Sequence, residues 1–173
     1  MIKKFYKSKL MADYYAADLR QIDWQYFKDK GIKLVFLDID NTLARHGSRE
    51  PDDYALELIE ILRSHDFDLC ILSNARSNRI EEYAGNLNVD FMENARKPSP
   101  KKLLDKLNEL DIAAENSILA GDQLFTDIWA GNKAKCWTLL VKQRFAEEAI
   151  QVRFKRKLEN YLFKRYGTSH KEL

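Results

Sequence analysis

Short apolar runs recur along the middle of this chain. They occupy residues 34–37, 69–72, 89–92, 118–120 and 137–141. Continuous apolar runs of this length are typical of strands that are buried on both faces of a parallel sheet. The pattern therefore predicts a parallel sheet built from these segments.

Apolar residues recur at helical spacing between the runs. After the first run they fall on one helix face at Tyr54, Leu58, Ile61 and Leu62. Ser99 and Pro100 form a helix start with Ser99 as N-cap, and the helix after them is predicted to bury Leu103, Leu104 and Leu107. Strands that alternate with helices over short connections predict a Rossmann-like α/β fold, a doubly wound parallel sheet in a three-layer arrangement.

Composition limits the class of protein. The chain has 173 residues, 45% apolar and 32% charged, which suits one domain with a substantial core. It contains no run of about 18 or more apolar residues and no apolar segment of signal-peptide length after its basic N-terminus. We therefore expect a soluble, cytoplasmic protein. Cys70 and Cys136 lie in apolar stretches, which favours buried free thiols over a disulfide framework or zinc site.

The net charge of +2 conceals an uneven distribution. Residues 1–30 carry seven basic and four acidic side chains, residues 31–141 carry 13 and 19, and residues 142–173 carry nine and four. The two flanks also hold 12 of the 20 aromatic residues. We therefore divide the chain into a basic, aromatic and helical N-terminal flank (1–30), an acidic centre (31–141) and a basic C-terminal helix (142–173).

Two acids follow the first predicted strand directly, as Asp38-Ile39-Asp40-Asn41-Thr42. Residues i and i+2 of a strand point the same way, so both carboxylates can face the crevice beyond the strand ends, where open α/β sheets bind ligands. Because neighbouring carboxylates repel each other, such a pair favours a bound cation or a shared proton. A solvated turn or helix cap would use the same residue types.

Each later strand also ends in residues suited to phosphate chemistry. Ser73 and Asn74 follow the second run, Lys97 comes after the third, and Asp122 and Asp127 follow the fourth. Each has an ordinary structural reading, such as a helix cap, a surface charge or an acid at a helix N-terminus. Their order, always at a strand end, favours one shared site.

The segments DIDNT, LSN, KP and GDQLFTD resemble the four motifs of the haloacid dehalogenase (HAD) superfamily of phosphohydrolases. The resemblance covers residues 34 to 141 and identifies the acidic centre as a HAD-like catalytic domain. ARKP, GDQLFTD and the basic aromatic tail further resemble the YqeG-type subclass IIIA phosphatases, which are similar to phosphatidylglycerophosphate phosphatases. The family implies hydrolysis of a phosphomonoester through an aspartyl-phosphate.

The resemblance also implies residue roles. Asp38 would be the nucleophile and Asp40 the general acid and base. Mg²⁺, which prefers oxygen ligands, would be held by the Asp38 and Asp122 carboxylates and the Asp40 carbonyl, with Asp127 supporting the metal shell. The groups that would bind the phosphoryl oxygens or hold their loop are Ser73, Asn74, Lys97 and Thr42.

The chain leaves no room for a cap domain, because the predicted elements fill the segments between the motifs. An uncapped site favours a large substrate surface or a partner that supplies a lid. The loop 43–50, with Arg45, His46 and Arg49, is the nearest element that could contact the leaving group. YqeG-type relatives are expected to carry a Trp and an acid here, so Arg-His-Gly departs from their pattern.

The C-terminal flank has an apolar stripe at helical spacing, with basic side chains that include Arg156 beside it. The stripe consists of Ile150, Phe154, Leu158, Tyr161 and Leu162. Such a helix packs on its own domain or on a second copy of the chain, or it lies on an anionic membrane surface at the inner face. Nucleic acid is not an expected partner.

Several functions remain open at this point. The first is hydrolysis of a phospholipid phosphomonoester such as phosphatidylglycerophosphate. A second is a soluble phosphatase for a sugar phosphate, nucleotide or phosphoprotein. A non-catalytic RNA- or ribosome-binding adaptor and a receiver-type signalling domain are the alternatives from other classes.

Overall fold

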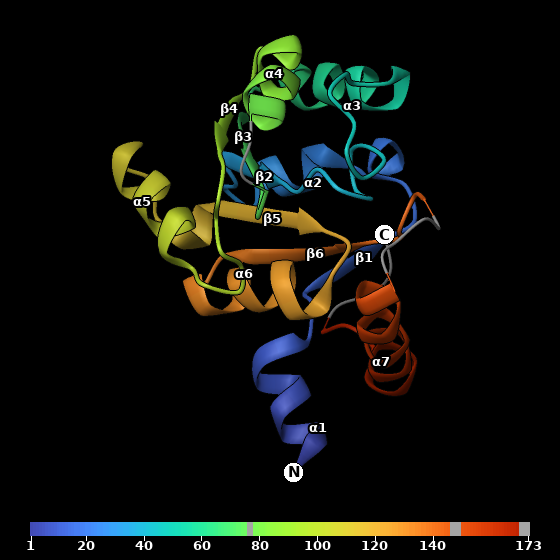
Figure 1. The fold of residues 1–173 in the computed structure, drawn as a ribbon. Helices are drawn as coiled ribbons and strands as arrows, with labels where there is room; N and C mark the ends of the chain where they lie inside the picture. The colour runs from blue at the N-terminus through green and yellow to red at the C-terminus, as the bar shows by residue number, and fades with distance from the viewer. Residues whose placement is uncertain (76–77, 146–149, 170–173) are drawn as a thin grey trace.

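Six parallel strands form one sheet at the centre of the molecule (Figure 1). The computed structural model describes residues 1–75, 78–145 and 150–169, with the side chains of the last range described from residue 155 onwards. The strand order is β1-β6-β5-β2-β3-β4. The strands are β1 (Tyr14–Ala16), β2 (Leu34–Leu37), β3 (Asp68–Leu72), β4 (Asp90–Met92), β5 (Ser117–Gly121) and β6 (Trp137–Val141).

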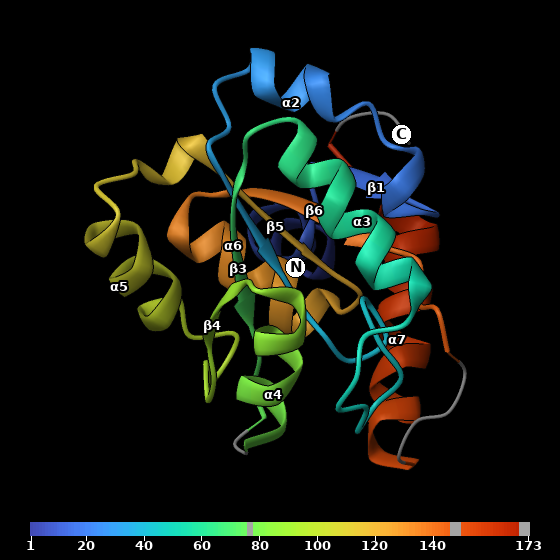
Figure 2. The same cartoon turned by 90° about the horizontal axis from the view of Figure 1, so that it is seen from above.

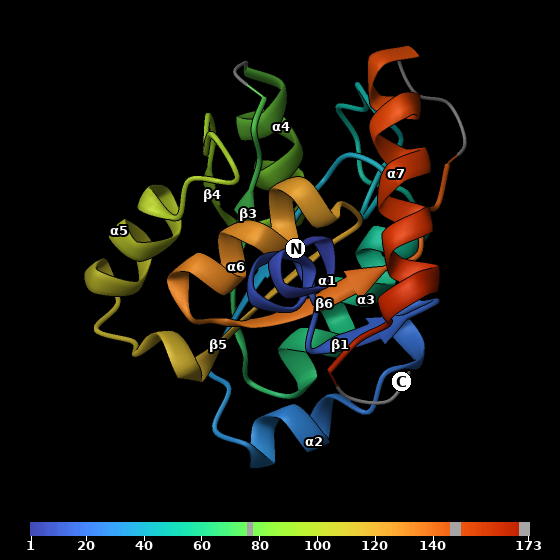
Figure 3. The same ribbon diagram turned by 90° about the horizontal axis from the view of Figure 1, so that it is seen from below.

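Helices cover both faces of the sheet, so the predicted three-layer α/β fold is confirmed. Figure 2 shows α2, α3 and α4 on one face, and Figure 3 shows α5 and α6 on the other. The helices are α1 (Ile2–Phe5), α2 (Trp24–Asp29), α3 (Asp53–Ser64), α4 (Asn78–Leu87), α5 (Lys101–Glu109), α6 (Trp129–Ala134) and α7 (Ile150–Tyr166). Between Asp38 and Ser73 the chain forms only a loop, α3 and β3, which leaves no inserted cap.

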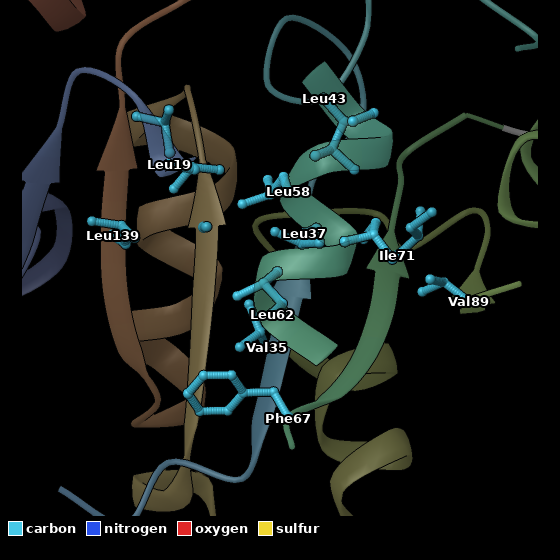
Figure 4. Close-up of a cluster of buried hydrophobic side chains, with 14 of the residues drawn as sticks. Leu19, Val35, Leu37, Leu43, Leu58, Leu62, Phe67, Ile71, Val89 and Leu139 are labelled. Carbon is cyan, nitrogen blue, oxygen red and sulfur yellow. The ribbon is translucent and has the colours of Figure 1, made fainter. Parts of the chain in front are cut away.

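Strand β2 shows why the apolar runs predicted strands so well. Val35 and Leu37 face the core cluster under α3, whereas Leu34 and Phe36 face the cluster under α5 and α6. Both faces are therefore buried, which requires an uninterrupted apolar sequence. Figure 4 shows the first cluster, where α3 lies across the strands with two leucine side chains directed at them.

The N-terminal flank supplies a strand that the sequence analysis missed. Tyr14 pairs in register with Leu139, so β1 extends the sheet beyond β6. Asp13 reinforces this edge, because its Oδ2 accepts hydrogen bonds from the Thr138 backbone N–H at 2.9 Å and the Thr138 hydroxyl at 3.0 Å. Further along the flank, the Trp24 side chain is buried in the main core cluster. This part of the flank is therefore packed into the sheet domain.

Helix α7 packs on the domain with a face that includes Leu162 of the predicted stripe but excludes its other described residues. Leu162 is buried, in a cluster with residues from the segment η1 (Tyr6–Leu10) and the helical turn η4 (Leu124–Ile128). Leu158 and Tyr161 are 50% and 62% exposed, so this part of the stripe does not pack on its own domain. The buried face instead carries the charged residues Arg156 and Glu159. The side chains at 150 and 154 lie outside the described residues.

Three smaller expectations can be compared with the structure. Helix α5 begins one residue later than predicted, with Pro100 as N-cap, although the Ser99 hydroxyl still accepts a hydrogen bond from the Lys101 N–H at 3.4 Å. Leu104 is 37% exposed, whereas Leu103 and Leu107 are buried as predicted. The two cysteines are free and buried, as expected. Among the described residues, no helix is long and apolar enough to cross a bilayer.

Candidate active site

The carboxyl ends of β2 and β5 bring two acids to one place. Leu37 pairs with Ala120 in register, and Asp38 continues this pairing by donating its N–H to the Ala120 carbonyl at 3.0 Å. Asp122 follows β5 in the same way. The chain runs outward in one direction from β2 to β3 and β4, and in the other from β5 to β6, so the two acids lie at the reversal of strand order. Open α/β sheets bind ligands at this switch point.

A buried cluster of three carboxylates and one ammonium group forms here. One oxygen from each of Asp38, Asp122 and Asp127 lies within 4.8 Å of the others. The Lys97 ammonium donates to Asp38 Oδ1 at 2.6 Å and to the Leu72 carbonyl at 2.7 Å. It also forms an ion pair with Asp127 Oδ1 at 2.6 Å. Lys97 therefore joins the predicted nucleophile to an acid 89 positions later in the sequence.

Burial and neighbouring charges both shift the pKa values of these groups. Burial raises the pKa of Asp38 well above its usual range, Lys97 opposes this, and Asp127 and Asp122 add to it. Burial likewise raises the pKa of Asp122 to about 7, although Arg156 opposes the shift. For Lys97, burial lowers the pKa but Asp127 and Asp38 outweigh it, so the net pKa is raised and the group stays charged.

Gly121 is required by the way Asp127 folds back over the end of β5. A Cβ at position 121 would lie 2.6 Å from the Asp127 Cβ, closer than such atoms approach. The Asp127 carboxylate is held there because its Oδ2 accepts a hydrogen bond from the Gln123 N–H at 3.1 Å. The GDQLFTD segment therefore places its second acid beside the first because its glycine lacks a side chain.

The predicted phosphate-binding residues divide into two groups. Ser73 is buried directly after β3, and its hydroxyl accepts a hydrogen bond from the Ala75 N–H at 3.2 Å. Asn74 instead holds the loop of Lys97: its Nδ2 donates to the Lys97 carbonyl at 3.1 Å and its Oδ1 accepts from the Lys97 N–H at 2.6 Å. The Thr42 hydroxyl is buried without a hydrogen-bond partner among the described residues.

The Asp40 carboxylate is not a member of the three-carboxylate cluster. Both of its oxygens accept hydrogen bonds from Arg79 of α4, at 3.1 Å each. His46 Nδ1 lies 3.4 Å from Asp40 Oδ1, although the His46 side chain is largely exposed. The carboxylate is thus held by a buried guanidinium, and the metal contact predicted for Asp40 is its backbone carbonyl, which this ion pair leaves unused.

The cluster fits a hard divalent cation. All three side chains offer oxygen atoms, which Mg²⁺ prefers. The Asp122 Oδ1 atom is buried and has no hydrogen-bond partner within the described part of the chain, a costly arrangement unless a cation meets it. The carboxylates of Asp38 and Asp122, with Asp127 beside them, are therefore suited to hold Mg²⁺.

Sequence reasoning missed two arginines of this site. Arg79 lies on α4 and contacts Asp40, while Arg156 lies on α7 and contacts the Asp122 carboxylate. Neither follows a strand, so the motif spacing gave no signal for them. The position of Arg156 beside an apolar stripe pointed instead toward the surface.

A parallel sheet with three acids and a lysine at the carboxyl ends of its strands suits chemistry on a phosphate group. Comparison with known proteins gives the family. A family model for haloacid dehalogenase-like hydrolases matches residues 27–135. The chain belongs to this family, and the resemblance drawn from its four motifs is confirmed.

Two curated relatives carry phosphatase names. The Bacillus subtilis protein named "Probable phosphatase YqeG" is 27% identical over 92% of this chain and 90% of its own length. The chloroplastic/mitochondrial phosphatidylglycerophosphate phosphatase 1 of Arabidopsis thaliana is 32% identical over 86% of this chain. The match covers 46% of that relative, so the chain spans less than half of it. We therefore assign the chain to the phosphatases of the family.

Solved structures show the same fold. The cobalt-bound deoxy-D-mannose-octulosonate 8-phosphate phosphatase of Haemophilus influenzae is 18% identical, with a TM-score of 0.52 over 81% of this chain and 92% of that one. A HAD family hydrolase of Deinococcus radiodurans with bound phosphate and sodium is 14% identical, with a TM-score of 0.54 over 84% and 92% of the two chains.

Proposed function

We propose that this chain hydrolyses a phosphomonoester in a Mg²⁺-dependent reaction, through an aspartyl-phosphate on Asp38, and that its substrate is a phospholipid phosphomonoester. The observation that carries the chemistry is the buried cluster of Asp38, Asp122 and Asp127 with Lys97. It provides a nucleophilic carboxylate, an oxygen-rich cation site and a fixed positive charge within one crevice.

The reaction proceeds in two displacements. A carboxylate oxygen of Asp38 attacks phosphorus, the bond from phosphorus to the leaving oxygen breaks, and that oxygen takes a proton from Asp40. A water molecule then gives its proton to Asp40 and attacks the aspartyl-phosphate, which releases inorganic phosphate and restores both acids. The Lys97 ammonium and the Ser73 hydroxyl neutralise and orient the phosphoryl oxygens.

Arg79 and Asn74 act indirectly in this scheme. Arg79 holds Asp40 at the rim, where it can meet the leaving oxygen, and Asn74 fixes the backbone on which Lys97 is carried. When bound, Mg²⁺ neutralises charge on the phosphoryl group as it is transferred. Asp38 and Asp122 would be its carboxylate ligands.

Chelation of divalent cations should stop turnover. Treatment with EDTA followed by its removal should lower the release of inorganic phosphate to background, and added Mg²⁺ should restore it, because phosphoryl transfer relies on charge neutralisation. Zn²⁺ and Ca²⁺, which differ from Mg²⁺ in preferred geometry, serve as controls. Full turnover in the stripped protein would contradict the metal dependence.

Three observations support a lipid substrate. The Arabidopsis relative acts on phosphatidylglycerophosphate by its name. The site has no inserted cap to enclose a small metabolite, so a substrate embedded in a surface can reach it. The N-terminal segment exposes Met1, Ile2 and Phe5 among Lys3, Lys4 and Lys7, a combination of apolar and basic groups that suits an anionic bilayer.

A panel of phosphomonoesters tests the substrate class. We expect Mg²⁺-dependent phosphate release to be fastest from phosphatidylglycerophosphate in anionic vesicles, and slow from glycerol phosphate, glucose phosphate, AMP and a phosphoserine peptide. The measurement is kcat/KM for each compound. A soluble ester that matches or exceeds the lipid would replace the lipid assignment with the soluble phosphatase, whereas no release from any compound would contradict the phosphatase chemistry itself.

Binding of charge variants to anionic vesicles tests whether the N-terminal segment contacts the membrane. Replacing Lys3, Lys4 and Lys7 with Gln should weaken vesicle binding by about 3 kcal/mol, on the order of 10²-fold, because each lysine near an anionic bilayer contributes about 1 kcal/mol. A matched triple variant at the exposed residues Lys30, Lys33 and Lys101 makes the same charge change elsewhere. Equal vesicle affinity in the two variants would contradict the role of the N-terminal segment.

A further inference from the structure

Helix α7 reaches the active site through Arg156. This side chain is 10% exposed and its guanidinium makes two contacts with one residue. Its Nη2 donates to Asp122 Oδ2, and its Nη1 donates to the backbone carbonyl of Asp122. A planar guanidinium that binds side-chain and main-chain oxygens together fixes the rotation of that carboxylate as well as its position.

The remaining oxygen of Asp122 is left for another partner. Asp122 Oδ1 is buried and has no hydrogen-bond partner among the described residues. Asp122 also shares the three-carboxylate cluster with Asp38 and Asp127. Arg156 thus occupies one oxygen of Asp122, and the other is available to the cation site. Hydrogen bonds to the outer oxygen of a metal-binding carboxylate commonly orient the ligand.

Two further contacts fix α7 where Arg156 can act. Glu159 is buried one turn along the helix, and its Oε1 accepts a hydrogen bond from the Phe125 N–H at 2.9 Å. Leu162 packs with Leu124 and Ile128 in an apolar cluster. Both contacts join α7 to η4, the turn that begins two residues after Asp122. Figure 3 shows α7 alongside the sheet domain.

We propose that Arg156 is a positioning residue, which orients Asp122 for a divalent cation and so couples the docking of α7 to cation binding. The inference rests on the cation site of the proposed function. Its consequence is that the C-terminal helix completes the active site from a segment outside the four motifs.

A competing arrangement would give the opposite result. If the guanidinium stood in the place of the cation, binding of Mg²⁺ would expel Arg156 and loosen α7. The contact with the Asp122 carbonyl and the unpartnered Oδ1 favour positioning, because Arg156 can keep both of its contacts while a cation meets Oδ1. The two arrangements therefore predict effects of opposite sign.

Calorimetric titration with Mg²⁺ alone measures the effect of Arg156 without turnover. Arg156→Gln should weaken Mg²⁺ binding by about 10- to 100-fold, the usual effect of removing a group that orients a metal ligand. The Mg²⁺ affinity of Arg156→Lys should lie between those of the native protein and Arg156→Gln, since an ammonium can reach only one of the two Asp122 oxygens well. Lys164→Gln removes an exposed charge from the same helix and should leave Mg²⁺ affinity unchanged.

Each outcome of the titration has a distinct meaning. Unchanged or tighter Mg²⁺ binding by Arg156→Gln, with native binding intact, would overturn the positioning role alone. Native protein that binds no Mg²⁺ would overturn the cation site of the proposed function and this inference with it.

Hydrogen exchange of the native protein tests the coupling even if Arg156→Gln fails to fold. Coupling is reciprocal: if docked α7 favours Mg²⁺, then Mg²⁺ must favour docked α7. Amides of α7 should therefore exchange more slowly when Mg²⁺ is added, and this slowing should be lost in Arg156→Gln. Faster exchange of α7 on adding Mg²⁺ would overturn the proposal.

Discussion

Asp38→Asn should reduce phosphate release on the order of 10⁴-fold or more, about 5.4 kcal/mol of activation free energy. The amide keeps the shape of the carboxylate but cannot form the acyl phosphate, so the loss falls on kcat. Lys97 retains its contacts with the Leu72 carbonyl and Asp127, and the fold should therefore survive. Measurement of kcat with Mg²⁺ and the best ester of the panel checks this result.

The same variant should be at least as stable as the native protein. Burial raises the pKa of Asp38, so between its ordinary and raised values the folded state keeps a proton that the unfolded chain releases. The contribution of Asp38 to the free energy of unfolding of the native protein therefore falls as pH rises from the ordinary to the raised pKa. Asn has no such equilibrium, so the advantage of Asp38→Asn in urea unfolding should grow as pH rises above the ordinary pKa of an aspartate.

Two results would contradict this reading. Substantial turnover by Asp38→Asn would remove Asp38 as nucleophile. A variant that unfolds at lower urea than the native protein at every pH would show that the Asp38 carboxylate stabilises the fold. Such stabilisation would mean that its ion pair with Lys97 outweighs the cost of burial.

Lys97→Met should have the largest effect on stability. The Lys97 side chain is 2% exposed, and its removal leaves Asp38 and Asp127 buried without their shared positive charge. Breaking a buried ion pair on one side costs about 3 to 5 kcal/mol. Urea unfolding at neutral pH should show this loss, and the loss should shrink in acid, where Asp38 can take up a proton instead.

Catalysis should fall in the same variant, by about 10²- to 10³-fold, because the phosphoryl oxygens lose a fixed positive charge. Lys101→Met provides the control, since Lys101 is exposed on the nearby helix α5 and undergoes the same chemical change. If Lys97→Met unfolded at the same urea concentration as Lys101→Met, the buried ion pairs would not be important to the fold.

The hydrophobic pattern predicted the buried strands. It failed for a very short strand and for a helix whose buried face is charged. The bounds of β2 and β6 were predicted to the residue because both faces of each are covered. Strand β1 has only three residues at the sheet edge, too few for a period to emerge. On α7 the apolar pattern placed Leu158 and Tyr161 on the packing face. The helix instead buries the charged residues Arg156 and Glu159, and an apolar pattern carries no information about buried charges.

The site was predictable as far as it lies on strand ends. Asp38, Ser73 and Asp122 each follow a strand directly, so the topology of the sheet brings them together. Lys97 was placed among them by its motif. Arg79 and Arg156 come from helices whose positions depend on tertiary packing, and their contacts with Asp40 and Asp122 cannot be derived from spacing along the chain.

The pairing of β1 with β6 also covers the outer side of an apolar strand. Strand β6 carries the apolar sequence WTLLV, and β1 occupies the hydrogen-bonding groups on its outer side. A chain shortened past Ala16 would present those groups and that sequence to solvent, a template for pairing with strands of other molecules. We therefore expect that removal of the N-terminal residues would promote self-association at this edge of the sheet, whatever the substrate is.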